Sequence, residues 1–281
     1  LKESKFSGIL NSDLEKFVLP VLIEHEMKEH LLELLNIIFD YKVADKGTSY
    51  RERESLLEKY WLNSLLEKHT NSMLKLIDTE GLEILISIIK KVISEDEGSF
   101  NNVWIATIEE HPQNSFPDRY DNQIISFTRD LLEHLTKEKV ENYIEKFLEE
   151  QHPIFKRLAF HTINNKYDEI KAIFWNWFEK FEDKRNSTFK HELCKLLYDN
   201  NSKFDSSEFD KLIAWMESLD YKKYYDDVSS EQLDVITAYK KKEWLWSIMQ
   251  SSVKARELYD KYNTINSSEL EHPCFEMWNY G

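Results

Sequence analysis

In two short motifs, histidine occurs together with acidic or cysteine residues at a spacing close to that of metal ligands. HEMKEH, from His25 to His30, resembles the zinc-protease pattern His-Glu-x-x-His, but one residue too many separates its histidines. A helix brings two imidazoles onto one face at a spacing of four, whereas a spacing of five puts them about 140° apart. HELC, which begins at His191, lacks a second histidine. We therefore expect no metal at either motif.

Motifs that depend on glycine are also missing from the sequence. It has five glycines and contains no Gly-x-Gly-x-x-Gly, Gly-Lys-Ser/Thr or Gly-x-Ser-x-Gly. Its many carboxylates lie among lysines, which favours solvated helix faces over an acid–base pair. We predict no catalytic residue and no cofactor. One alternative stays open, a helical enzyme whose site is assembled from scattered side chains such as Glu29, His30, His134 and His161.

A histidine–proline pair occurs three times, at His111, His152 and His272, and the last two continue as Glu-x-His-Pro-x-Phe. Proline suits the first position of a helix, and the residue before it is pushed to an extended conformation. We interpret the pair as a structural joint and not as part of an active site. His152 is then a loop or capping residue, and Pro153 opens a helix.

The helix that Pro153 is predicted to open has a wide apolar stripe. Ile154, Leu158 and His161 share one face at helical spacing, so we expect Ile154 and Leu158 to be buried and His161 to be hydrogen-bonded against the core. Arg157 is expected to point away from this stripe.

Tryptophan and arginine are enriched in protein-binding hot spots, so we take Arg157, Trp175 and Trp244 as protein-binding candidates. Trp175 lies in FWNWF, where the spacing of Phe174, Trp177 and Phe178 predicts a core stripe, and Trp244 follows a lysine triplet. The alternative is that both tryptophans only pack between helices.

Composition and charge limit the class of protein. The chain has 281 residues with 41% hydrophobic and 32% charged, few Gly or Pro, and a net charge of −15, which favours helices and disfavours a nucleic-acid partner. Cys194 and Cys274 are far apart, without metal spacing or a disulfide framework, as in a reducing cytoplasm. The most apolar stretch, 82–93, is too short to span a membrane, and we expect a cytoplasmic protein without a membrane partner.

Helical periodicity runs through almost the whole chain and predicts an all-α fold. The expected helices include 51–69, 103–111, 153–165, 187–200 and 253–265, and 44–50 is expected to be a linker. His111, His152 and His272 are separated by 41 and 120 residues, which suggests a period of about 40, typical of HEAT-like solenoids of antiparallel helix pairs. We expect an N-terminal helical part, 1–110, and C-terminal repeats, 111–281, in one continuous solenoid.

Two stretches, EEHPQNSFPDRYDNQIISFTRDLLEHL and HPIFKRLAFHTI…FWNWF, together with the closing EHPCFEMWNYG, resemble the C-terminal helical regions of large bacterial antiphage proteins. Those proteins couple such a region to a STAND-type NTPase or to a sirtuin-like or nuclease effector. The resemblance covers about half of the chain and leaves the N-terminal third unmatched. It implies a bacterial sensor region that recognises a phage protein, such as a structural protein of the phage, with the effector elsewhere in the polypeptide.

The sequence thus predicts a non-catalytic protein-recognition module. We expect it to be part of a larger protein, because the chain begins at Leu1 and not at methionine. Removal of a tag would leave the same start. The rival interpretations are a general interaction scaffold without a defence role and the helical enzyme named above.

Overall fold

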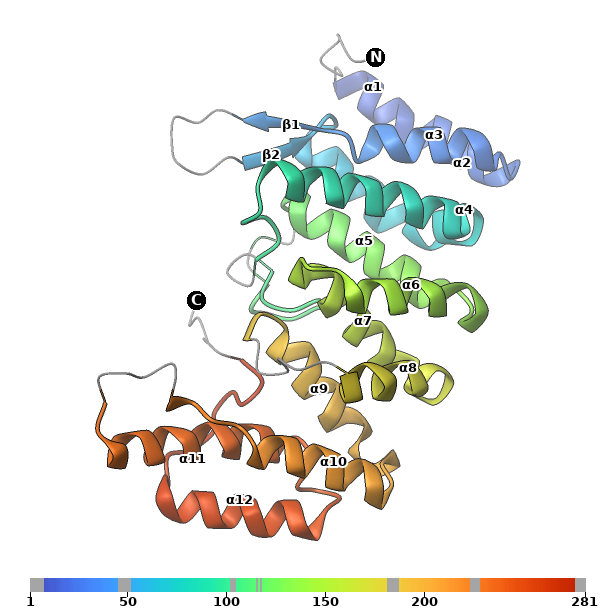
Figure 1. The fold of residues 1–281 in the computed structure, drawn as a ribbon. Helices are drawn as coiled ribbons and strands as arrows, with labels where there is room; N and C mark the ends of the chain where they lie inside the picture. The colour runs from blue at the N-terminus through green and yellow to red at the C-terminus, as the bar shows by residue number, and fades with distance from the viewer. Residues whose placement is uncertain are drawn as a thin grey trace. The chain divides into compact units, whose positions relative to one another are not determined.

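A computed structural model describes residues 8–44, 52–101, 105–114, 116, 118–180, 187–222 and 228–275. Over these residues the chain is mostly helical, with one two-stranded sheet (Figure 1). None of the described helices is long and apolar enough to cross a membrane. The chain divides into two compact units, Leu1–Leu158 and Ala159–Gly281, so the boundary expected after residue 110 falls inside the first unit.

The first unit begins with a helix that contains a proline without breaking. It runs as α1 (Gly8–Asp13), a π-helical turn (Leu14–Val18) and α2 (Leu19–Glu24). The N–H of Leu19 donates to the carbonyl of Leu14, five residues back, just before Pro20. Proline cannot supply an N–H to the ladder, and the wider π turn beside it accommodates this loss.

α3 (Lys28–Ile38) is a separate helix, because Glu26 has a φ of 49° and ends α2. His25 therefore lies in the turn after α2 and His30 lies in α3, and both are exposed. Among the described residues, no group of three or more His, Cys, Asp or Glu side chains is arranged to hold a metal ion.

The sequence pattern predicts no strand, yet a short hairpin follows α3. β1 (Tyr41–Ala44) pairs antiparallel with β2 (Glu52–Ser55), with Tyr41 opposite Ser55. The predicted helix start at residue 51 is therefore wrong, and α4 begins at Lys59. Ser55 holds this turn of the chain: its hydroxyl donates to the Ile38 carbonyl at 2.9 Å and accepts the Leu57 N–H at 3.0 Å.

α4 (Lys59–Glu95) is kinked at Asp78, which has a φ of 47° and a ψ of −147°. The Asp78 carboxylate accepts the N–H of Thr79 at 2.7 Å and so caps the second segment, as aspartate commonly does. Gly81 lies close to the kink, where an added Cβ would come within 2.8 Å of the Ile77 side chain. The tight approach explains why the smallest residue occurs here.

The stretch 105–114 is not helical, so the helix predicted over 103–111 is wrong for its described part. Side chains from elsewhere in the first unit satisfy its backbone instead. The guanidinium of Arg129 donates to the Ile108 carbonyl at 3.1 Å, and that of Arg157 donates to the Ala106 carbonyl at 2.9 Å. Asn114 binds Thr107 through both its amide nitrogen and its oxygen, at 2.9 Å each.

The remaining helices follow the sequence prediction closely. They are α5 (Tyr120–His134), α6 (Lys137–Glu149), α7 (Pro153–Asn165), α8 (Tyr167–Lys180), α9 (Lys190–Asn200), α10 (Ser206–Glu217), α11 (Ser230–Trp246) and α12 (Val253–Ile265). α7 and α12 match their predicted bounds, and a 3₁₀ turn, Ser187–Phe189, completes the helix predicted from residue 187. The boundary between the two compact units lies within α7.

The core of the second unit is rich in aromatic side chains. Phe160 of α7 meets Trp177 of α8 edge-on, with centroids 4.8 Å apart, and Trp215 of α10 meets Trp244 of α11 at 4.9 Å. Phe178 of α8 contacts Trp215 at 5.6 Å and so links the two pairs. Such edge-to-face contacts add about 0.5–1.5 kcal/mol each beyond the burial of apolar area.

Candidate functional site

The three side chains predicted to bind a protein are buried, so the expectation that they are available to a partner is wrong. Arg157 is 1% exposed, Trp244 3% and Trp175 9%. Arg157 does leave the Ile154–Leu158 stripe, as expected, but it turns onto the backbone of residues 105–114. Trp175 donates its indole N–H to the Tyr167 hydroxyl at 3.0 Å and packs in the aromatic core.

The four side chains of the alternative enzyme site lie on three different helices and are divided between the two compact units. Glu29 and His30 are exposed in the first turn of α3, and His134 is exposed at the end of α5. His161 lies in the second unit, is 8% exposed, and has its Nε2 3.1 Å from the amide nitrogen of Asn165. This agrees with the predicted hydrogen-bonded histidine at the core.

The histidine–proline pairs form turns, as predicted for joints. In each pair the carbonyl of the histidine accepts the N–H three residues on, at 2.9 Å for His111, 3.3 Å for His152 and 3.0 Å for His272. The ring Nδ1 of His152 also accepts the N–H of Ile154 at 3.3 Å, and that of His111 accepts the N–H two residues on at 3.1 Å.

Of the three pairs, the one at His152 leads directly into a described helix. α7 begins at Pro153, with Ile154 and Leu158 fully buried, which confirms the prediction. His152 caps this helix because its Nδ1 satisfies one of the free N–H groups of the first turn. Burial lowers the pKa of His152, which favours the neutral ring, the form in which Nδ1 can accept.

In the unit Ala159–Gly281, two cysteines that are 80 residues apart in the sequence lie side by side, each within a motif that also contains a histidine. HELC lies in α9, and HPCF follows α12. The sulfurs of Cys194 and Cys274 are 2.7 Å apart, and both are free thiols. Beside them, the rings of His191 and Phe275 lie at a centroid distance of 4.3 Å.

A buried ion pair lies close to this cysteine pair. Lys190, one turn before Cys194 in α9, binds the carboxylate of Glu243 in α11 at 3.0 Å, and Lys240 binds the same carboxylate at 3.2 Å. Burial and the neighbouring Cys274 raise the pKa of Cys194, while the charge of Lys190 opposes this rise. Cys194 is fully buried, and Cys274 is partly exposed.

The lysine triplet before Trp244 is not a basic surface, because Lys241 and Lys242 are buried in contacts with other helices. Lys241 donates to the Glu217 carbonyl at the end of α10, at 2.5 Å. Lys242 donates to the side chain of Asn263 at 3.0 Å and to the carbonyls of Asn266 and Ser268 at 2.7 and 2.6 Å. α11 thus connects α10 with α12 and the segment after it.

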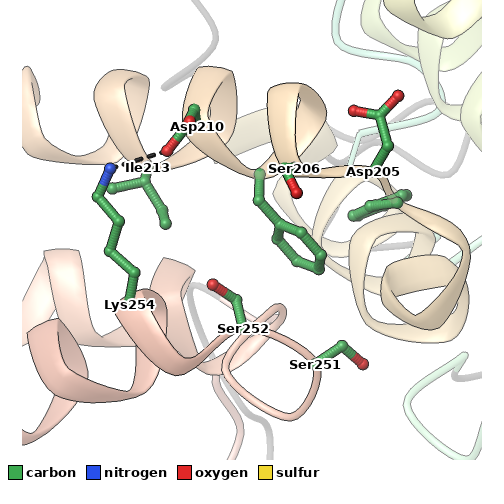
Figure 2. A pocket seen from close by; sticks show the side chains of 9 residues that line it. Asp205, Ser206, Asp210, Ile213, Ser251, Ser252 and Lys254 are labelled. Atoms are coloured by element: carbon green, nitrogen blue, oxygen red, sulfur yellow. Dashed lines mark hydrogen bonds and ion pairs between the residues drawn. The ribbon is translucent and has the colours of Figure 1, made fainter.

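A hollow of about 500 Å³ lies between the start of α10 and the turn that leads into α12 (Figure 2). Asp205, Ser206, Asp210 and Ile213 come from the α10 side, and Ser251, Ser252 and Lys254 come from the other (Figure 2). Lys254 and Asp210 form an ion pair at 2.8 Å.

Asp205, Ser251 and Ser252, which line this hollow, already have hydrogen-bond partners. Asp205 accepts the Glu208 N–H and donates its own N–H to the Glu208 carboxylate, both at 2.9 Å, which is a capping box. Ser252 caps α12 by accepting the Ala255 N–H at 3.3 Å, and Ser251 donates to Asn201. The hollow therefore has the chemistry of two capped helix starts and presents no convergent set of catalytic groups.

Aromatic side chains do reach the surface elsewhere among the described residues, at Phe17, Tyr60, Phe116 and Tyr198, and the two tyrosines each contact a tryptophan. Tyr60 is 71% exposed at the start of α4, with its ring 5.3 Å from that of Trp61. In the second unit, Tyr198 is 40% exposed and stacks on Trp246 at 4.4 Å with nearly parallel rings. Neither tyrosine was singled out from the sequence, because residue type alone does not distinguish an exposed aromatic side chain from a core one.

The cysteine pair was also missed from the sequence. Spacing rules for cysteines find ligands and disulfides that are close along the chain, and a separation of 80 residues gives no such signal. The available sign was that each cysteine belongs to a motif that was noted for its histidine. Comparisons of the chain with protein-family models, with curated proteins and with solved structures find no match.

Proposed function

We propose that the chain is a non-catalytic protein-recognition module, built as a HEAT-like solenoid of antiparallel helix pairs. The observation that carries the proposal is the packing of helices that are consecutive in the sequence. In the first unit α3 packs on α4 and α4 on α5, and in the second α10 packs on α11 and α11 on α12. Sequential packing of this kind is the defining feature of helical repeats, whose extended surfaces commonly bind proteins.

The exposed aromatic side chains suggest where a partner binds. Tyrosine and tryptophan are enriched in hot spots because they offer a large contact area with few rotatable bonds. We therefore propose Tyr60 with Trp61, and Tyr198 with Trp246, as contact residues, in place of the buried Arg157, Trp175 and Trp244. The net charge of −15 supports a protein partner over nucleic acid.

The narrower proposal is a sensor region of a bacterial antiphage NTPase, active in the cytoplasm. Its support is the resemblance of residues 109–178 and of the closing residues to such regions, and the closing residues beyond Phe275 lie outside the described part of the chain. The partner is then a phage protein, and an effector domain of the same polypeptide receives the signal. A general interaction scaffold is the second candidate, since the same helix packing supports it equally.

Affinity capture tests the narrower proposal. The chain and the longer protein that contains it serve as baits in phage-infected and uninfected cells, and mass spectrometry identifies what is enriched only on infection. A single phage protein enriched with both baits supports the sensor, provided that the purified phage protein then binds the purified chain. Tight binding of DNA that weakens steeply with salt, or turnover of a small molecule by the chain, contradicts recognition of a protein. If both baits enrich only host proteins, the scaffold is favoured.

A further inference from the structure

The cysteine pair is arranged for a reaction between its two sulfurs. The Sγ atoms of Cys194 and Cys274 are 2.7 Å apart, and a disulfide bond is about 2.05 Å long. Bond formation thus requires the sulfurs to approach by only roughly 0.7 Å. The sequence contains no other cysteine that could compete for either sulfur.

The segment that carries Cys274 is held in place on both sides of the cysteine. Lys242 binds the carbonyls of Asn266 and Ser268 before it, and the ring of Phe275 packs on His191 directly after it. These contacts limit the freedom of the segment that carries Cys274. They therefore help to keep the sulfur of Cys274 close to that of Cys194.

The two thiols differ in their access to a reagent. Cys274 is partly exposed, whereas Cys194 is fully buried in α9. An oxidant from solution therefore reaches Cys274 first, and Cys194 acts as the resolving thiol behind it. Redox-sensitive cysteine pairs commonly combine an accessible cysteine with a resolving one.

We infer that Cys194 and Cys274 form a redox-sensitive dithiol, which a peroxide converts to a disulfide that fastens residues 266–275 to α9. In the first step the Cys274 sulfur attacks the O–O bond of hydrogen peroxide. An S–O bond forms, the O–O bond breaks, and one water leaves with the thiol proton. The Cys194 sulfur then attacks the Cys274 sulfur, an S–S bond replaces the S–O bond, and a second water leaves with the Cys194 proton. The two cysteines lose two electrons and the peroxide gains them.

The disulfide closes a long loop, because 80 residues separate the two cysteines. In the chain-entropy account a cross-link over such a distance restricts the unfolded chain strongly. Oxidation therefore shifts the urea midpoint of unfolding upward, and reduction reverses the shift. This inference is independent of the proposed recognition of a protein, since it requires only the second unit to be folded.

The test uses the purified 281-residue chain, reduced and then exposed to a small excess of hydrogen peroxide. We expect the intact mass to fall by about 2 Da, because two hydrogens are lost. Both thiols should become resistant to alkylation, and a linked peptide should contain Cys194 and Cys274. Dithiothreitol should restore the original mass. In the Cys194→Ser variant, dimedone should trap the sulfenic acid of Cys274. In the Cys274→Ser variant, the buried Cys194 should not be oxidised by the peroxide and should still be alkylated after denaturation.

Several results overturn the inference. Both thiols of the folded parent chain could remain free, Cys274 could gain oxygen atoms while Cys194 stays alkylatable, or the linked peptides could join two different chains. The measurements on the parent chain decide the matter even if a serine variant fails to fold.

Discussion

Replacing Lys242 with methionine is expected to destabilise the second unit, although it removes a buried charge. Lys242 is fully buried, and its ammonium donates to Asn263, Asn266 and Ser268 at 2.6–3.0 Å. Hydrogen bonds to a charged group contribute about 1.5–3 kcal/mol each, so three of them amount to roughly 5–9 kcal/mol before any offset.

Two effects reduce this value. Burial lowers the pKa of Lys242, which shows that the ammonium is costly to desolvate, and the penalty for such an ion is several kcal/mol. Asn266 is also partly exposed and Ser268 exposed, so water can replace the lysine at their carbonyls. We therefore expect Lys242→Met to lower the free energy of unfolding by about 2–4 kcal/mol, since methionine keeps much of the volume and none of the hydrogen bonds.

Urea denaturation followed by circular dichroism measures this loss. The matched control is Lys203→Met, because Lys203 forms an exposed pair with Asp168 at 2.8 Å and such pairs contribute about 0–1 kcal/mol. A double-mutant cycle with Asn263→Ala should show a coupling of about 0.5–3 kcal/mol. If Lys242→Met were as stable as the parent or more stable, the desolvation penalty would exceed the hydrogen bonds, and the role given to Lys242 would be refuted.

Three further substitutions test individual positions. Leu158→Ala should cost about 2–5 kcal/mol in urea denaturation because Leu158 is fully buried, and an unchanged midpoint would contradict its place in the core. Gly81→Ala should cost roughly 1–3 kcal/mol, since its Cβ would meet buried Ile77 at 2.8 Å, whereas a gain in stability would mean that helix propensity dominates. The pKa of His152 is lowered on folding. The contribution of His152 to the free energy of unfolding is therefore fully present above about pH 6.5, the value for an unfolded histidine, and is lost as pH falls through the folded pKa. His152→Asn keeps an acceptor for the Ile154 N–H without titrating, so its stability should fall less than that of the parent between pH 7 and 5, and equal slopes would argue against the cap.

Local patterns predicted most of the helices but not the places where tertiary contacts dominate. The bounds of α7 and α12 follow from periodicity and a proline start, which are properties of the segments themselves. The described residues 105–111 have helical periodicity as well, but Arg129 and Arg157 bind carbonyls in this stretch and hold it in another conformation. Such contacts come from distant parts of the chain and leave no mark in the local pattern.

The candidate site was harder to predict for the same reason. Tryptophan and arginine have the side chains of hot spots, but Trp175 and Trp244 fill a core, and Arg157 satisfies buried carbonyls. Periodicity gives the face of a helix on which a residue lies, not whether another element covers that face. Contact between Cys194 and Cys274 likewise depends on how the segment after α12 returns to α9.

Titration of the purified chain with a phage protein captured from infected cells tests the central claim most directly. Recognition through the exposed aromatic pairs predicts saturable binding, weakened at least about thirtyfold by Tyr60→Ser or Tyr198→Ser, because hot-spot aromatics contribute about 2 kcal/mol or more. Val21→Ser, at an exposed valine far from both aromatic pairs in sequence, should leave the affinity unchanged. Binding that neither tyrosine variant weakens would contradict the proposed contact surfaces, and absence of binding by the folded chain would contradict the claim that it recognises a phage protein.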